Sequence, residues 1–265
     1  KDTHKTRLYQ EMEDAHRTAF QRDRDRIIYS NSFRNLSDKR QVLVEHDSER
    51  NRSRLTHTVE VVQVSKTICK AMGLNEDLTE AIALGHDLGH PPFGHTGEAI
   101  LDDLLSGEDK AEGTLSGENF GGFKHNYQSL RVVDILEKKY GYDGLNLTAV
   151  VREGILKHTS TRNERYSYPD MHLSDLHYDH LMALTLEGQV AAIADEIAQR
   201  TFDLEDALRA NYLSLKDTRE LKLVQDVETS GRIQELLHAN QDEYINFLIS
   251  GLVRLLVSDV IQNTI

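Results

Sequence analysis

Two of the chain's three prolines are adjacent, at Pro91 and Pro92, and they constrain the fold more than any other feature of the sequence. Proline is otherwise rare in the 265 residues and helix-forming residues occur throughout, which favours long helices. Pro91 disfavours the helical conformation for His90, so a helix must end at this point. The sequence contains neither an internal repeat nor an alternating strand pattern of useful length. It therefore predicts an all-α protein.

Apolar residues at steps of three and four predict helices along most of the chain. A helix over 54–72 is expected to end at Gly73, a residue typical of a left-handed cap. Another is expected over 75–87, because Asn75 and the acidic residues after it suit a helix N-terminus. Three more helices are predicted downstream, over 128–140, 145–158 and 180–208. Gly188 is the candidate position for a break in the last of them.

Length and composition favour a single domain. With 38% hydrophobic residues, the chain has enough apolar side chains for one sizeable core or for two small ones. We interpret residues 1–265 as one domain with a core over about 17–208 and a helical extension over 209–265. The amphipathic run 247–261 could pack on this core or against another subunit. Because the chain ends inside an apparently helical run, the sequence does not establish whether its C-terminus is complete.

Charge and cysteine content favour an acidic protein of the cytoplasm. The net charge of −13 disfavours nucleic acid as a partner, although the arginines within 17–26 form a local basic patch that two aspartates weaken. The single Cys69 excludes a disulfide within the chain and fits a reducing compartment. The N-terminus lacks the apolar stretch of a signal peptide. The run 247–261 contains Arg254 and Asp259, so it is judged too short and too charged to span a membrane.

The stretch GHDLGHPPFGHTGE, residues 85–98, points to metal chemistry. His86 and Asp87 sit together at the expected helix end and can both turn toward one ion. His57 lies on the preceding predicted helix, and Asp195 lies among apolar residues, where a carboxylate is costly unless it is paired or coordinated. Two imidazoles and two carboxylates suit one divalent ion, with Mg²⁺ or Mn²⁺ favoured and Fe²⁺, Zn²⁺, Co²⁺ or Ni²⁺ open. The plainer alternatives are a hydrogen-bonded helix histidine at His57 and an arginine partner for Asp195.

The order His57, His86-Asp87, Asp195 resembles that of the HD superfamily of metal-dependent phosphohydrolases. Six blocks within about 17–208 resemble the deoxyguanosine-triphosphate triphosphohydrolase family more closely. In chain order they are QRDRDRIIYSNSFRNL, RSRLTHTVEV, GHDLGHPPFGHTGE, GGFKHNYQSLR, GLNLTAVVREGILKH and EGQVAAIADEIAQRTFDLEDAL. The resemblance implies an all-helical HD-domain bundle with a metal centre between helices. It also implies hydrolysis of a deoxynucleoside triphosphate (dNTP) to deoxynucleoside and inorganic triphosphate, with the same four residues as metal ligands.

His95 and Glu98 are candidates for the acid that protonates the leaving group. They are three residues apart on the helix expected after PPFG, so they face the same way. A carboxylate behind an imidazole fixes its orientation and favours its protonated form. We therefore expect Glu98 to orient His95 as general acid, a role that the resemblance also implies; the alternative is a simple surface contact. By resemblance, His125 is a second active-site histidine.

The resemblance also assigns contacts with the substrate. Arg54 precedes His57 by one helical turn and would bind phosphate with its fork of donors, unless it forms a salt bridge instead. The other residues at substrate-contacting positions are Asn126 and Lys157 for phosphate and Gln41 and Asp203 for the 3′-hydroxyl. For Asn126 and Lys157 the alternative is a solvated side chain.

One departure from the family pattern concerns the sugar. Gln199 stands where many relatives carry a tyrosine that packs under the deoxyribose, so the selectivity for deoxyribose stays open. The resemblance further implies a homo-oligomer and, in some relatives, a dNTP activator at a second site. Two other functions remain as alternatives: another HD-domain phosphohydrolase, such as a nucleotidase or phosphodiesterase, or a nucleotide- or nucleic-acid-binding module. The sequence does not determine the base preference, the metal, the activator or the oligomer size.

Overall fold

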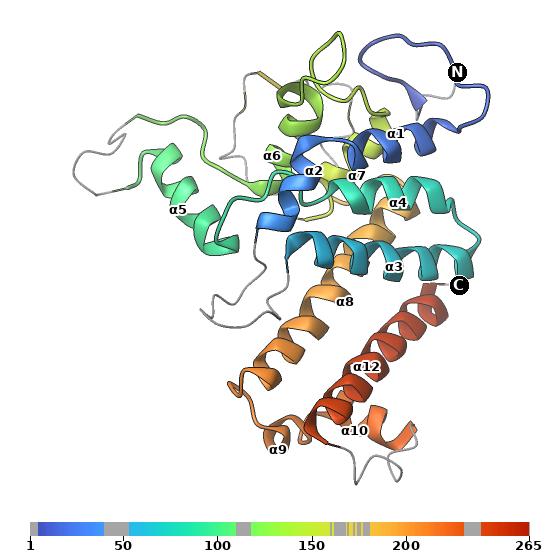
Figure 1. Ribbon diagram of the computed structural model, residues 1–265, viewed down its shortest axis with the longest axis vertical. Coiled ribbons are helices and arrows are strands. Elements are labelled where there is room, and N and C mark those ends of the chain that lie inside the picture. Colours follow the sequence, from blue (N-terminus) through green and yellow to red (C-terminus); the bar gives the residue numbers. More distant parts are fainter. Residues whose placement is uncertain are drawn as a thin grey trace. The chain divides into compact units, whose positions relative to one another are not determined.

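A computed structural model describes most of the chain, and helices dominate it (Figure 1). The described residues are 5–39, 53–109, 118–159, 161, 168, 170, 171, 173, 176, 181–230 and 240–264. Within these residues the secondary structure is helical and includes no β-strand. The predicted all-α fold is therefore confirmed.

The chain divides into two compact units, residues 1–193 and 194–265. The boundary lies inside one continuous helix, α8 (Leu186–Arg209). The interpretation of residues 1–265 as one domain, with a core over 17–208 and an extension over 209–265, stays a prediction.

Helix α4 lies at the centre of the first unit. It packs against α1, α3 and α7, and α7 also packs against α6. Figure 1 shows α3 and α4 side by side. The elements before α8 are α1 (Ala19–Ile28), α2 (Asn31–Arg34), the short 3₁₀ helix η2 (Asn35–Asp38), α3 (Arg54–Met72), α4 (Glu76–Gly85), α5 (Gly94–Ser106), α6 (His125–Arg131), the π-helical turn η3 (Val132–Leu136) and α7 (Ala149–Leu156). The central helix α4 therefore contacts helices from distant parts of the sequence.

The predicted helix over 54–72 is confirmed as α3, and local signals set both of its ends. The Ser53 side chain accepts a hydrogen bond from the backbone N–H of Thr56, which caps the N-terminus. Gly73 ends the helix with φ of 68°, a left-handed conformation that suits glycine. Asn75 caps α4 in the same way as Ser53 caps α3, by accepting from the N–H of Leu78.

The other predicted helices are present with shifted bounds. The helix expected over 128–140 begins earlier, at His125, and ends as η3 at Leu136. The helix expected over 145–158 is shortened to α7, because the backbone N–H of Thr148 bonds to the Asp23 carboxylate before the first turn. The candidate break at Gly188 is wrong, since α8 runs through it. A Cβ at Gly188 would lie 2.6 Å from the Ala183 Cβ, so close packing explains the glycine.

The second unit has an apolar core of its own. It contains the rest of α8, α9 (Leu215–Thr218), α10 (Lys222–Ser230) and α12 (Gln241–Thr264). Helices α10 and α12 pack together, and a Cβ at Gly251 would lie 2.3 Å from the Val227 Cγ1. The core cluster consists of Leu208, Val224, Val227, Tyr244, Ile245, Leu248, Ile249 and Leu252. The run 247–261 thus supplies part of this core.

Helix α12 corrects the judgement that the apolar run near the C-terminus is too short to span a membrane. At 24 residues it is long and apolar enough to do so, by length and composition. This is weak evidence for a membrane span, because core helices of soluble proteins pass the same test. Tyr244, Ile245 and Leu248 of α12 are buried in the core of the second unit.

Candidate metal centre

Helices α3 and α4 bring together three of the four predicted metal ligands. His57 lies in the first turn of α3, His86 caps the C-terminus of α4, and Asp87 follows it. All three side chains are buried. One ligand atom from each lies within 4.8 Å of the other two, so a single cation could contact all three. The capped start of α3 and the end of α4 at Gly85 therefore fix this geometry.

The hydrogen bond of His86 determines which ring nitrogen can bind a metal. Its Nδ1 lies 2.7 Å from the carbonyl oxygen of Ala83. A carbonyl oxygen only accepts, so Nδ1 carries the proton and the lone pair of the neutral ring is on Nε2. Nε2 lies 3.7 Å from Oδ1 of Asp87. A second nitrogen held by a carbonyl is typical of metal-binding histidines.

Asp87 is ionised and is paired with Arg54 within the described residues. The Arg54 Nη1 donates to Oδ2 of Asp87 at 2.5 Å, and both side chains are buried. Burial raises the pKa of Asp87, but the nearby His86 and Arg54 lower it more, so the pKa lies well below its usual range. The salt bridge considered for Arg54 is therefore present, while its contact with phosphate stays a prediction. Arg54 Nε, also buried, has no hydrogen-bond partner within the described part of the chain.

Three predicted site residues cannot be placed beside these ligands. Asp195 and Asp203 lie on the part of α8 that belongs to the second unit, as does Gln199. The convergence of Asp195 on the ion and of Asp203 on the sugar therefore stays a prediction. Gln41 lies outside the described residues.

The expected pairing of Glu98 with His95 is wrong, because Glu98 contacts His125 instead. Glu98 Oε2 lies 2.7 Å from Nδ1 of His125, and Lys124 Nζ lies 3.8 Å from the other carboxylate oxygen. Both members of the His125–Glu98 pair are buried, whereas His95 is exposed on the first turn of α5. Burial raises the pKa of Glu98, but its bond with His125 lowers it more, to about 2. His95 and Glu98 both lie on α5, three residues apart, as expected. The hydrogen-bond partner of Glu98 is nevertheless a buried histidine on α6, 27 positions away.

His90 is a site residue to which sequence reasoning gave no role. It is buried, its ring stacks on His125 with centroids 4.5 Å apart, and the His95 ring lies 5.4 Å from it. Its Nδ1 has no hydrogen-bond partner within the described residues. Burial lowers the pKa of His90 to about 2, so the ring is neutral. The adjacent Pro91 was the only signal at this position.

His158 is a second residue that the sequence did not identify. It follows Lys157, the C-cap residue of α7, and its Nδ1 lies 2.8 Å from the carbonyl oxygen of Ile155. Its Nε2 lies 3.1 Å from Nε2 of His125, and its ring centroid is 5.1 Å from that of His86. Only proximity to the predicted Lys157 could have drawn attention to it.

Asn126 and Lys157 are both buried, so the solvated alternative considered for them is wrong. Asn126 donates to the Leu156 carbonyl at 2.7 Å, while its Oδ1 has no partner within the described residues. Lys157 pairs with Glu153 at 2.8 Å, and Glu153 also accepts from the N–H of Leu184 at 3.0 Å. Their contacts with phosphate stay predictions.

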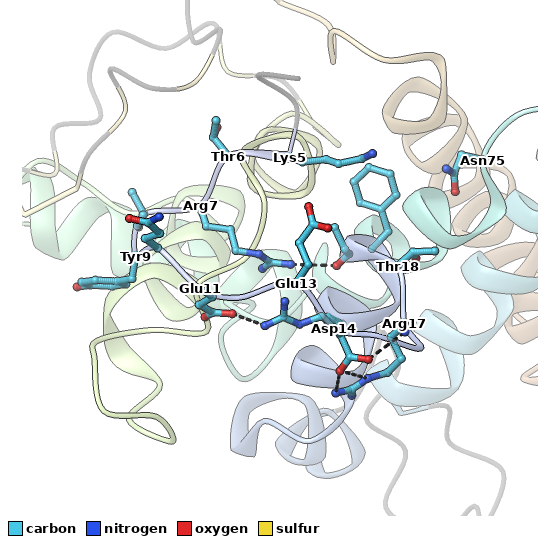
Figure 2. A pocket seen from close by; sticks show the side chains of 15 residues that line it. Lys5, Thr6, Arg7, Tyr9, Glu11, Glu13, Asp14, Arg17, Thr18 and Asn75 are labelled. Carbon is cyan, nitrogen blue, oxygen red and sulfur yellow. Dashed lines mark hydrogen bonds and ion pairs between the residues drawn. The ribbon is translucent and has the colours of Figure 1, made fainter. Parts of the chain in front are cut away.

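A pocket of about 650 Å³ lies along the N-terminal segment (Figure 2), and the arginines that line it are paired with carboxylates of the protein. Arg7 bonds with Asp23 at 2.6 Å. Arg17 bonds with Asp14 at 2.7 Å, and Arg22 contacts Glu11. These arginines are therefore engaged already, and the pocket carries none of the predicted site residues.

Comparison with known proteins gives a consistent result. Residues 54–200, more than half of the chain, match the family model described as HD domain. The chain is 44% identical to the deoxyguanosinetriphosphate triphosphohydrolase-like protein of Syntrophus aciditrophicus, over 97% of this chain and 61% of the relative. It is 45% identical to a protein of the same name from Geobacter metallireducens, over 83% of this chain and 53% of the relative.

A third relative of the same name, from Nitrobacter hamburgensis, is 41% identical over 96% of this chain and 64% of the relative. The chain thus spans between about half and two thirds of the length of these curated relatives. The matched range 54–200 begins at Arg54 and includes His57, His86, Asp87 and Asp195.

Proposed function

Because the chain belongs to the HD-domain family, we propose that it is a metal-dependent phosphohydrolase that converts a dNTP to deoxynucleoside and inorganic triphosphate. One observation carries the proposal: the buried ligand atoms of His57, His86 and Asp87 lie within 4.8 Å of one another. Asp195 is proposed as the fourth ligand. The names of the similar proteins support a dGTP-like substrate.

The residues present fit a divalent ion. Two imidazoles and a carboxylate are a mixed nitrogen and oxygen set, and the Nε2 lone pair of His86 is fixed by the Ala83 carbonyl. When bound, the ion would offset the charge of the α-phosphate and polarise its oxygen. Mg²⁺ and Mn²⁺ are the ions we propose first.

Three cationic or donor side chains of the first unit would hold the triphosphate. Arg54 has a buried Nε without a hydrogen-bond partner within the described residues, so it can donate to a phosphate oxygen while Nη1 contacts Asp87. Lys157 and Asn126 are proposed as further phosphate contacts. Since Lys157 is bonded to Glu153, its contact with phosphate requires that this ion pair rearrange.

A proton must reach the 5′ oxygen when water attacks the α-phosphorus and the P–O bond breaks. His95 is proposed as its donor, because its side chain is exposed beside the buried cluster and its ring lies 5.4 Å from that of His90. Glu98 and His125 form a separate pair, so Glu98 is proposed to orient His125 rather than His95. Gln41 and Asp203 are proposed as contacts of the sugar.

Product identification tests the proposed function. The protein is incubated with each dNTP and NTP in the presence of Mg²⁺ or Mn²⁺, in water labelled with a heavy oxygen isotope. We expect unlabelled deoxynucleoside and labelled inorganic triphosphate, because water attacks phosphorus. Release of orthophosphate or a nucleoside monophosphate would instead indicate a different HD-domain phosphohydrolase. Nucleotide or nucleic-acid binding without any hydrolysis would indicate a binding module.

The remaining partners are also proposals. A homo-oligomer, a dNTP activator at a second site and a cytoplasmic location follow from the resemblance and composition alone, and nucleic acid is the least supported partner. Sedimentation with and without dNTPs tests the first two. A monomer in both conditions would reject assembly.

A further inference from the structure

Lys39 is a cation near Arg54 and Asp87 to which neither the sequence nor the proposed function assigns a role. It follows the 3₁₀ helix η2 and is half-buried. Its backbone carbonyl accepts a hydrogen bond from the N–H of Arg54 at 2.8 Å, and η2 packs against α3. Lys39 is thus held next to the residue whose side chain bonds with Asp87.

The Lys39 ammonium has no counter-ion of its own among the residues that the structure describes. It forms neither a hydrogen bond nor an ion pair with them, and the charged groups that act on it are Arg54 and Asp87. Burial lowers the pKa of Lys39 and Arg54 lowers it further, while Asp87 raises it. Two cations therefore share a single carboxylate.

That carboxylate already has other partners. Asp87 Oδ2 accepts from Arg54 Nη1 at 2.5 Å, and Oδ1 lies 3.7 Å from His86 Nε2. Lys39 therefore does not serve as the structural partner of Asp87. Because a charge taken partly out of water is costly without a partner, the surplus cation favours an anionic ligand.

A phosphate group is the anion that Arg54 and Lys39 suit. Arg54 offers a planar fork of donors, of which Nε is buried without a hydrogen-bond partner within the described residues. Lysine adds a compact charge with three donors, a group common in phosphate sites. Neither side chain distinguishes one nucleobase from another by these contacts.

We propose that Lys39 is a phosphate-binding residue that holds the triphosphate chain of the substrate together with Arg54. The inference deepens the proposed function and rests on it, because it takes the substrate to be a nucleoside triphosphate. One consequence concerns the product. Inorganic triphosphate carries the same phosphate groups, so it should bind to these two side chains without a nucleoside.

Binding of inorganic triphosphate to the chelator-treated protein tests the assignment without turnover. Calorimetry compares the parent with Lys39→Met, which removes the charge and keeps a long side chain. Loss of a charge-assisted hydrogen bond should raise the Kd by about tenfold or more. Lys138→Met is the matched control, because Lys138 is exposed and paired with Asp143, and its Kd should equal that of the parent. Lys39→Arg keeps the charge and should bind more tightly than Lys39→Met.

Two further readouts separate phosphate binding from a structural role of Lys39. The Kd of the parent for inorganic triphosphate should rise more steeply with salt than that of Lys39→Met, because the variant lacks one charge contact. Deoxyguanosine, which has no phosphate, should bind equally to both proteins. A loss of deoxyguanosine affinity as large as the loss of triphosphate affinity would indicate a distorted site and overturn the assignment.

A parent protein that does not bind inorganic triphosphate would overturn the proposal, as would a Lys39→Met variant with the Kd of the parent. Lys39→Gln gives the same comparison if circular dichroism shows that Lys39→Met is unfolded. Failure of this inference is distinguishable from failure of the proposed function. Triphosphate binding that depends on Lys39, without release of triphosphate from any dNTP, would keep the phosphate-binding role and reject the proposed activity. Release of triphosphate with unchanged binding in Lys39→Met would do the reverse.

Discussion

Two buried polar networks in the first unit differ in whether their polar atoms are satisfied within the protein. The first joins the N-terminal segment, whose side chains Figure 2 draws, to α1 and to the start of α7 through Asp23. Asp23 is completely buried, and its Oδ1 accepts from Arg7 at 2.6 Å. Its Oδ2 accepts from the backbone N–H and the hydroxyl of Thr148, at 2.9 and 2.6 Å. Both oxygens of this carboxylate therefore have donors.

Glu11 completes this first network. Its Oε1 accepts from Tyr142 at 2.6 Å and from Asn146 at 2.5 Å, and its Oε2 contacts Arg22 and Arg26. Burial raises the pKa of Glu11, but these partners, Arg26 foremost, lower it more, to about 2. We call Arg7, Glu11, Asp23 and their partners the closed network, because their charges are neutralised internally.

The second network is the metal-centre cluster of α3, α4, α6 and α7, and it is open. Arg54 Nε, His90 Nδ1 and Asn126 Oδ1 are buried without hydrogen-bond partners within the described residues. Since buried polar atoms are nearly always satisfied, a cluster of exceptions indicates a site for a ligand. The contrast distinguishes polar groups that stabilise the fold from polar groups that are available to a ligand.

Breaking the closed network should give the largest loss of stability. Asp23→Ala removes the acceptor of Arg7 and Thr148 and leaves a buried charge, so the free energy of unfolding should fall by ~3–5 kcal/mol. Denaturant titration measures it. Asp14→Asn is the matched control in the same pocket, because its pair with Arg17 is exposed and should contribute little. A small loss for Asp23→Ala would show that this network does not stabilise the fold.

Removing a proposed metal ligand from the open cluster should affect turnover more than stability. His57→Gln removes a proposed metal ligand, so turnover should fall by more than ~100-fold. Mutation of residues that only hydrogen-bond to metal ligands already lowers metal affinity or activity by ~10–100-fold. The free energy of unfolding of the metal-free protein should change by less than ~1 kcal/mol. Steady-state kinetics and denaturant titration measure the two effects. Full activity in His57→Gln would show that the open cluster is not required for turnover.

Acid should lower the free energy of unfolding through His90, a buried residue of the open cluster. Burial lowers the pKa of His90 from 6.5 to about 2, so only the unfolded chain binds a proton there as the pH falls below 6.5. Stability therefore decreases with falling pH, by ~2 kcal/mol at about pH 5 from this group alone. His90→Gln should lose that much less stability than the parent between about pH 7 and 5, measured with chelator present. An identical pH dependence in the two proteins would contradict this.

One hydrogen-bonded bridge inside the open cluster should show a smaller effect. The buried Ser129 hydroxyl donates to the His86 carbonyl at 2.7 Å and accepts from the Gly89 N–H at 2.9 Å. Ser129→Ala should lower the free energy of unfolding by ~1–2 kcal/mol, because both backbone groups lose a buried partner. It should also weaken Mn²⁺ binding, since His86 loses its support. Unchanged metal affinity, measured by calorimetry, would show that the bridge does not position His86.

The sequence predicted what depends on local signals. The helix over 54–72 and its glycine cap follow from periodicity and from the conformation that Gly73 allows. His86 and Asp87 lie together because they are adjacent in sequence, directly after the last residue of α4. The His57 position was predicted from its place in a strongly periodic helix together with the family pattern.

The partners of the buried histidines could not be predicted in the same way. The sequence spacing paired Glu98 with His95, and only the folded structure shows that it bonds with His125. His158 meets His125 across 33 positions of sequence, and no spacing rule reports such a contact. Side-chain pairing over these distances depends on helix packing, which periodicity does not specify.

Anomalous X-ray diffraction from crystals grown with Mn²⁺ would locate the ion. We expect a manganese peak within about 2.5 Å of ligand atoms from His57, His86 and Asp87. Crystals saturated with Mn²⁺ that show no peak among these three side chains would contradict this expectation.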